Sequence, residues 1–145
     1  MRFVLCSPRR GYPRVVGWRC QVRDVPCLLS REPRSDGAGV SVAIVSLYTL
    51  IHIPLDDQRE LLSRIFVALR PGGLLLAIVG HEQWTGVEDY LGAPMFWEHA
   101  DTDTKLAWLR EDGFDVLWHR YVPEGDVGHT LLLAQRPETA GSYAT

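Results

Sequence analysis

The segment Val42–Val79, which reads VAIVSLYTLIHIPLDDQRELLSRIFVALRPGGLLLAIV, carries most of the information about the fold. It begins with an unbroken apolar run at Val42–Tyr48 and ends with another at Leu74–Val79. Unbroken apolar runs rich in aliphatic residues are typical of strands that are buried on both faces of a parallel sheet, whereas strands with one wet face alternate. The segment therefore predicts two interior strands.

A helix is predicted between these strands. Pro54 precedes Asp56 and Asp57, whose charges suit the positive end of a helix, and Pro71-Gly72-Gly73 cannot continue one. Between these limits, apolar residues recur at helical spacing and make one apolar face: Leu61, Leu62, Ile65, Phe66 and Leu69. Strand, helix and strand with short connections form a right-handed parallel crossover unit.

A second helix is predicted after a long connection. Residues 80–100 contain several aromatic side chains and read as this connection. Asp101 can cap a helix that runs to about residue 112 and stops at Gly113, with Leu106 and Leu109 facing inward.

The chain then returns to strands. Apolar and β-branched residues predict strands at Phe114–Val122 and His129–Gln135. The turn between them, at residues 123–128, is short enough to make the pair an antiparallel hairpin.

Residues 1–40 differ from the rest of the chain in charge and pattern. They hold eight arginines against three acidic residues and all three cysteines, whereas residues 41–145 hold seven basic and fifteen acidic residues. Prolines interrupt the apolar runs Phe3–Leu5 and Cys27–Leu29, so at best short extended pieces are expected there. The segment is either genuine divergent sequence or out-of-frame text of a GC-rich coding sequence, which fourteen arginines against one lysine indicate.

The length of 145 residues allows one domain at most. We expect a partial α/β domain at residues 41–136, a poorly structured segment at 1–40 and a disordered polar tail at 137–145. The basic segment lacks interleaved aromatic residues and a helical face, so no nucleic-acid partner is expected. No apolar run approaches the ~18 residues of a membrane span, and we expect a soluble, cytoplasmic protein with reduced thiols.

Three strings at matching distances resemble the carboxyl-terminal half of class I S-adenosylmethionine-dependent methyltransferases. They are the strand and its exit at Ala43–Pro54, the turn Leu69-Arg70-Pro71-Gly72-Gly73, and Leu109-Arg110-Glu111-Asp112-Gly113-Phe114. The resemblance covers about residues 42–136. It implies an incomplete Rossmann-like sheet whose strands match the fourth to seventh of that family, the last pair being an antiparallel hairpin.

The resemblance also implies a cofactor site that this chain holds only in part. In the family, S-adenosylmethionine rests on a glycine-rich turn after the first strand, outside the carboxyl ends of the parallel strands. Here Gly37-Ala38-Gly39 leads into a strand, which is the wrong context for such a turn. We therefore expect this chain alone to bind S-adenosylmethionine weakly or not at all.

The strand end and its exit supply the candidate site residues. Ser46, Leu47 and Tyr48 match the strand end that contacts the methionine part of the cofactor in the family, although Leu47 and Tyr48 could also simply pack on the next helix. His52 lies just beyond, where a histidine could accept a proton from the group that is methylated. The alternative is a histidine that hydrogen-bonds the loop backbone.

The aromatic connection is the candidate substrate lid. Trp84, Met95, Phe96 and Trp97 could wall an apolar pocket for a small molecule, or could cover the sheet as ordinary core. Metal-compatible groups in the same region follow no known ligand spacing, and no metal is expected: His81, Glu82, His99, Asp101 and Asp103.

Two functions remain open from the sequence. One is a methyltransferase domain that acts on a small-molecule acceptor and lacks the glycine motif; the other is a non-catalytic, degenerate or truncated fragment with no tight ligand. A different nucleotide-binding α/β module is a weaker third possibility, because such folds typically end on a parallel strand. If the family's first strand is absent, one edge of residues 42–48 is unpaired, and self-association through that edge is expected.

Overall fold

The computed structural model describes residues 4–9, 17–22, 39 and 41–138. The described chain is α/β, as expected. Its elements are β1 (Val4–Arg9), β2 (Gly17–Val22), β3 (Ser41–Ser46), the 3-10 turn η1 (Leu50–His52), α1 (Leu55–Ala68), β4 (Leu69–Gly80), β5 (Trp84–Tyr90), β6 (Ala93–His99), α2 (Thr102–Glu111), β7 (Asp115–Glu124) and β8 (Val127–Gln135).

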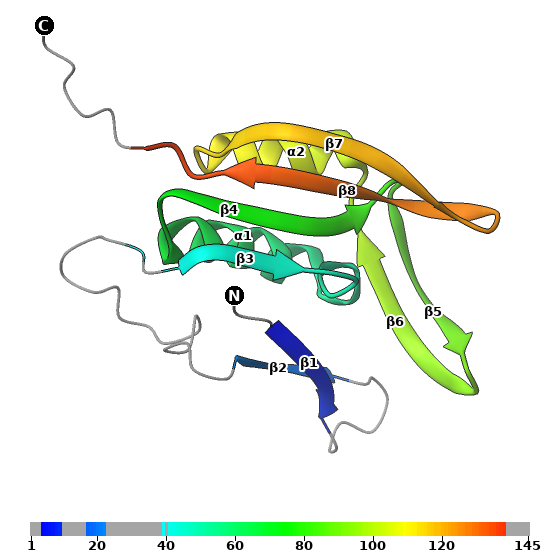
Figure 1. Cartoon of the computed structure of the whole chain (residues 1–145). Helices are drawn as coiled ribbons and strands as arrows, with labels where there is room; N and C mark the ends of the chain where they lie inside the picture. The colour runs from blue at the N-terminus through cyan, green and yellow to red at the C-terminus, as the bar shows by residue number, and fades with distance from the viewer. Residues whose placement is uncertain (1–3, 10–16, 23–38, 40, 139–145) are drawn as a thin grey trace, which may run out of the picture.

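Four strands form the central sheet, in the order β3-β4-β8-β7 (Figure 1). β3 and β4 are parallel, joined through α1 as predicted, and β8 lies antiparallel between β4 and β7. This arrangement confirms the parallel crossover unit and the terminal antiparallel hairpin. The turn of that hairpin is tighter than predicted, because β7 runs to Glu124 and β8 begins at Val127, with Gly125 in the left-handed region at φ 63°.

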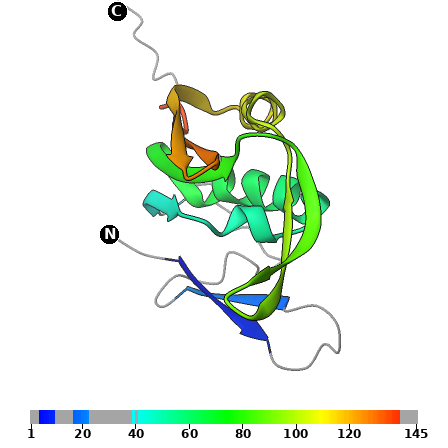
Figure 2. The same ribbon diagram turned by 90° about the vertical axis from the view of Figure 1, so that its right-hand side faces the viewer.

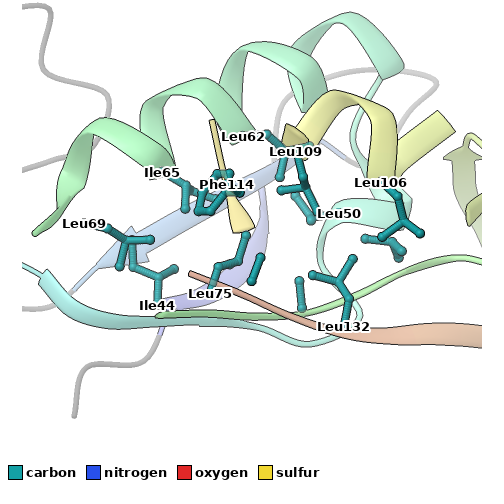
Figure 3. Close-up of a cluster of buried hydrophobic side chains, with 13 residues drawn as sticks. Ile44, Leu50, Leu62, Ile65, Leu69, Leu75, Leu106, Leu109, Phe114 and Leu132 are labelled. Carbon is teal, nitrogen blue, oxygen red and sulfur yellow. The ribbon is translucent and has the colours of Figure 1, made fainter. Parts of the chain in front are cut away.

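Both helices cover the same face of the sheet and enclose the core (Figures 1 and 3). α1 contributes Leu62 and Ile65, and α2 contributes Leu106 and Leu109, all at most 3% exposed. They pack against alternate residues of the strands, which point to this face because side chains alternate along a strand. Those strand residues include Ile44, Leu75, Ala77, Val79, Leu132 and Ala134.

Arg136 explains why α1 ends where it does. Its guanidinium donates to the carbonyl oxygens of Phe66, Val67 and Leu69 at 3.1, 3.1 and 2.7 Å, which are among the acceptors left over at a helix end. Its backbone also exchanges hydrogen bonds with the Pro71-Gly72-Gly73 turn, and Gly72 adopts φ 73°. The turn is therefore joined to the chain just after β8, and β4 begins at Leu69 rather than at Leu74 because Leu69 pairs with Ser41 of β3.

α2 follows its predicted limits closely. The carboxylate of Asp101 accepts a hydrogen bond from the backbone N–H of Thr104 at 2.8 Å, as an N-cap does, and Gly113 adopts φ 98° just past the helix end. Within the described residues, no helix is long and apolar enough to cross a membrane.

The aromatic connection is a β-hairpin rather than an irregular loop. β5 and β6 pair antiparallel from Trp84–His99 to Tyr90–Ala93 and project from the end of the central sheet (Figures 1 and 2). Leu91 and Gly92 form its two-residue turn at φ 54° and 81°, and positive φ at both positions is what a tight hairpin turn requires. No strands are predicted in this connection from the sequence, because Leu91-Gly92 lacks the usual Asn-Gly or Asp-Gly signal of such a turn.

Residues 1–40 contain two strands in the described ranges. β1 and β2 pair with each other antiparallel, from Val4–Val22 to Arg9–Gly17, and do not join the central sheet. The apolar runs suggested strands near Phe3–Leu5 and Cys27–Leu29; the first overlaps β1, whereas Cys27–Leu29 lies outside the described residues. Most of the expected tail, residues 139–145, also lies outside them.

Candidate functional site

The sheet topology gathers polar side chains at one edge. β3 and β4 are parallel, so their carboxyl ends, Ser46 and Gly80, lie at the same edge. β8 is antiparallel to them, and it brings His129, near its amino-terminal end, to that edge opposite Gly80. β7 ends there at Glu124. In open α/β sheets, ligands bind outside the carboxyl ends of the parallel strands, so this carboxyl edge is the candidate site.

The predicted cofactor-contact residues occupy the end of β3. Ser46 is buried, whereas Leu47 and Tyr48 are 49% and 44% exposed. The alternative that Leu47 and Tyr48 are ordinary packing residues fits these exposures poorly. Tyr48 also adopts φ 53°, a left-handed conformation that costs a bulky residue free energy and persists only where other contacts impose it.

The Tyr48 side chain is held by residues of the β7–β8 hairpin. Its hydroxyl donates a hydrogen bond to Oε1 of Glu124, and its ring lies edge-on to the His129 imidazole with centroids 5.5 Å apart. The hydrogen bond to the carboxylate is the main cause that raises the pKa of Tyr48, so the phenol stays a donor. These contacts account for the strained backbone at Tyr48.

His129 sits beneath this contact. Its residue is 9% exposed, and Nδ1 lies 3.3 Å from Oε2 of Glu124, close enough for an ion pair. The geometry is not that of an aligned hydrogen bond, and Nδ1 is a buried atom without a hydrogen-bond partner. Sequence pattern does not single out His129, because neither its strand nor its neighbours in sequence mark it as a site residue. Only the cross-strand register brings it to the site.

His52, the predicted proton acceptor, lies at the end of η1. Its Nδ1 is 2.9 Å from the backbone oxygen of Phe96, and its ring centroid is 4.3 Å from that of Trp97. A carbonyl oxygen can only accept, so Nδ1 carries the proton and Nε2 is the basic nitrogen of the neutral ring. Partial burial lowers the pKa of His52, more than the bond to Phe96 raises it, which favours the basic form at neutral pH.

The structure brings only some of the predicted lid residues to His52. Phe96 and Trp97 contact it from β6, and the indole Nε1 of Trp97 is a buried donor without a hydrogen-bond partner. Met95 is half-buried one residue further along. Trp84 is 47% exposed and packs over Gly86, the residue that pairs with Trp97 across the hairpin.

A third histidine, His99, lies at the carboxyl edge, at the end of β6. Its ring lies against Gly80, where an added Cβ would come within 2.0 Å of Nδ1, so only glycine fits there. The centroids of His99 and His129 are 6.3 Å apart, and His99 Nδ1 donates to the carbonyl oxygen of Glu82 at 2.6 Å. Burial, and to a smaller extent the neighbouring histidines and Lys105, lower the pKa of His99. Within the described ranges, no group of three or more metal-compatible side chains could hold an ion.

Gly39 lies at the other edge of the sheet, before the start of β3. An added Cβ would come within 2.0 Å of the carbonyl oxygen of Leu69, so this glycine allows two backbone segments to pack closely. It has no part in the carboxyl edge; Gly37 and Ala38 lie outside the described residues.

No family model and no curated protein matches the chain. Solved structures do. An S-adenosylmethionine-dependent methyltransferase from Methanosarcina mazei superposes with a TM-score of 0.57 at 15% identity, over 70% of this chain and 61% of that one. The chain has part of the class I methyltransferase fold. It spans about three fifths of the length of that structure.

Two further structures bear on what this fold can do. A 1,6-didemethyltoxoflavin-N1-methyltransferase from Burkholderia thailandensis, solved with that molecule and S-adenosylhomocysteine, gives a TM-score of 0.54 at 18% identity, covering 67% of this chain and 44% of that one. The cyclase SpnF gives 0.56 at 16% identity, covering 79% and 54%. At these identities the likeness shows the fold alone, and a methyltransferase-like fold is compatible with more than one chemistry.

Proposed function

We propose that this chain forms the acceptor side of an S-adenosylmethionine-dependent methyltransferase that acts on a small molecule. The observation that carries the proposal is the carboxyl edge of a methyltransferase-like sheet lined by His52, His99 and His129 and walled by Trp97. A basic nitrogen beside an aromatic wall suits an acceptor with a hydroxyl or amine to be methylated. The structural neighbour from Burkholderia thailandensis was solved with a small molecule, 1,6-didemethyltoxoflavin, bound.

S-adenosylmethionine fits the described residues only in part. The end of β3, where Ser46 is buried and Leu47 and Tyr48 are exposed, can form one lip of its site and contact its methionine part. No glycine-rich turn follows β3 or β4 at the carboxyl edge, and Gly39 lies at the opposite edge. The described residues therefore supply no glycine motif at this edge, and we expect other residues to hold the rest of the cofactor, which supplies an electrophilic methyl group when bound.

His52 is the proposed proton acceptor. Its Nδ1–H is tied to Phe96, so the basic Nε2 has a defined position, and its lowered pKa keeps the ring neutral and able to take a proton. Trp97 and Phe96 line the same wall, while Met95 and Trp84 would extend it along the β5–β6 hairpin, which serves as the lid. Methyl transfer is an in-line displacement, so this wall acts mainly by orienting the acceptor.

The alternative is a non-catalytic fragment. Its support is the incomplete fit of the cofactor and the span of about three fifths of the Methanosarcina mazei structure. The cyclase among the structural neighbours also shows that a protein with a related fold can have another activity.

Calorimetric titration separates the two. We expect S-adenosylmethionine to bind the chain with a Kd above about 1 mM, because several buried hydrogen bonds of roughly 0.5–1.5 kcal/mol each are missing. The protein translated from the longest reading frame that contains this chain should bind at micromolar concentration and transfer labelled methyl groups. Micromolar binding by the chain itself would show that residues 1–40 complete the site; no binding by either protein would favour the non-catalytic alternative.

Substitution of His52 tests the role assigned to it. In the protein translated from the longest reading frame, His52→Ala should lower kcat about 100-fold, because the loss of one acid–base group costs about that much in rate. The affinity for S-adenosylmethionine should stay within a factor of two. His119→Ala is the matched control, since His119 is an exposed histidine on β7. An unchanged kcat would assign His52 to packing and to its backbone hydrogen bond.

A further inference from the structure

Glu124 joins two side chains that come from different parts of the fold. Its Oε1 accepts the hydrogen bond of the Tyr48 hydroxyl, and its Oε2 lies 3.3 Å from Nδ1 of His129. Tyr48 follows β3, Glu124 ends β7 and His129 lies near the start of β8, so three elements converge on one carboxylate. The Glu124 side chain is 35% exposed, which leaves the cluster open to solvent on one side.

We propose that Glu124 and His129 form a subsite that binds a hydroxyl or amine of the acceptor molecule, a group distinct from the one that is methylated. The subsite deepens the proposed function and rests on it. Its recognition group is Nε2 of His129, which accepts a hydrogen bond from the ligand. Glu124 and Tyr48 act as positioning residues.

The charges decide which ring nitrogen faces the ligand. Oε1 of Glu124 accepts a hydrogen bond from Tyr48, and Oε2 of the same carboxylate faces Nδ1 of His129. A proton on Nδ1 of His129 is therefore favoured, because a lone pair there would face the carboxylate at 3.3 Å. In the neutral ring this leaves the lone pair on Nε2. A carboxylate behind a histidine sets the tautomer in this way in many binding sites.

Burial makes the unaligned contact between Nδ1 of His129 and Glu124 costly. Nδ1 of His129 and Nε1 of Trp97 are the only buried side-chain nitrogen or oxygen atoms without a hydrogen-bond partner among the described residues. Both belong to the carboxyl edge, and a buried polar atom without a partner costs roughly 1–3 kcal/mol. Small shifts on ligand binding would align Nδ1 with Glu124, since the two atoms are already within ion-pair distance.

The left-handed backbone of Tyr48 supports the same interpretation. Strained conformations of this kind cluster at ligand-binding sites, where the surrounding contacts impose them. Tyr48 lies over the His129 ring with its hydroxyl on Glu124, so it restrains both members of the pair. A purely structural role would not require a 44% exposed tyrosine at the mouth of the edge.

Two matched fragments test the subsite without any methyl transfer. Phenol carries a hydroxyl donor, and anisole is the same ring with that donor replaced by a methyl ether. In long-range ¹H–¹⁵N spectra of the whole chain, we expect Nδ1 of His129 to carry the proton and phenol to shift Nε2, whereas anisole leaves it in place. In Glu124→Gln we expect the tautomers to mix and the affinity for phenol to fall about tenfold.

Several results would overturn the proposal. They are a proton on Nε2 in the unaltered chain, equal shifts from phenol and anisole, or undiminished phenol binding in Glu124→Gln. Tyr48→Phe is the second variant should Glu124→Gln unfold; it keeps the ring and removes only the hydroxyl, and it should weaken phenol binding by a smaller factor. His119→Asn should change nothing.

Kinetics then separate this subsite from the role of His52. In the protein that binds S-adenosylmethionine, Glu124→Gln should raise the KM for a hydroxylated acceptor about tenfold with kcat nearly unchanged, the pattern of lost uniform binding. A fall in kcat with unchanged KM would contradict a binding role. If no methyl transfer occurs at all, the proposed function fails, while the phenol and anisole spectra still decide whether the subsite exists.

Discussion

The helix-covered core and the carboxyl edge of the sheet differ in the side chains that they hold and in how those side chains are partnered. In the core, Leu62, Leu75 and Leu132 are at most 1% exposed and belong to one cluster of buried apolar side chains. At the edge, polar side chains meet at the strained backbone of Tyr48, and the two buried polar side-chain atoms that have no hydrogen-bond partner among the described residues lie there. The comparison indicates that the core maintains the fold, whereas the carboxyl edge holds polar groups that lack hydrogen-bond partners among the described residues.

The largest effect is expected from the core. Leu132→Ala removes a side chain of β8 that is 0% exposed within the apolar cluster, and it should lower the free energy of unfolding by about 2–5 kcal/mol through lost burial and a cavity. Urea denaturation followed by circular dichroism measures this loss. Leu117→Ala is the control, because Leu117 is 49% exposed on β7 and should change stability by less than about 0.5 kcal/mol. Equal losses would show that the core is not packed as described.

Lys105 is a buried basic residue, and it allows a second test of the buried region. Lys105 is 0% exposed, donates to Oε1 of Gln58 and lies 4.3 Å from the ring centroid of Trp108. Burial lowers its pKa from 10.5 to about 8, against a smaller opposing effect of Glu98. Between these values the unfolded chain holds a proton that the folded chain has released, so stability should rise with pH from about 8 to 10.5.

The size of this rise is on the order of 2–3 kcal/mol, at about 1.4 kcal/mol for each pKa unit. Urea denaturation at a series of pH values measures it. Lys105→Met is the control: its stability should not show this rise, whatever its absolute value. A stability of the unaltered chain that is flat or falls over the same range, relative to Lys105→Met, would contradict the buried charge.

The side of β3 that pairs with no other described strand allows a test at the surface of the molecule. Within the described residues, β3 pairs only with β4, and Val42 is 59% exposed. An unprotected apolar edge favours pairing with a second chain, so we expect the protein to self-associate through residues 42–48. Val42→Lys should weaken association about tenfold, or roughly 1.4 kcal/mol, as measured by light scattering across a concentration series. A monomer at all concentrations would show that this edge is covered.

The smallest effect on stability is expected at the carboxyl edge itself. Tyr48→Phe removes a hydrogen bond between two partly exposed side chains, and the free energy of unfolding should change by less than about 0.5 kcal/mol. Its consequence should instead appear in phenol binding. A loss of stability comparable to that of Leu132→Ala would mean that the edge supports the fold, and the contrast between the two regions would fail.

Much of this arrangement was predictable from local sequence. The buried strands, α1 between them and the cap of α2 at Asp101 follow from apolar runs, helical spacing and capping residues, which act over a few residues along the chain. The hairpin β5–β6 was not predicted, because its Leu91-Gly92 turn carries a weak signal and its side chains do not alternate clearly between buried and exposed.

The candidate site divides in the same way. Sequence pattern by itself indicated the strand end at Ser46–Tyr48 and the position of His52 just after it, because both depend on where β3 stops. Only the tertiary structure placed Glu124 and His129 beside Tyr48, since their meeting depends on β8 lying antiparallel between β4 and β7. Strand order and register are set by long-range pairing and burial, and residues separated by 76 positions, such as Tyr48 and Glu124, have no local signal that would bring them together.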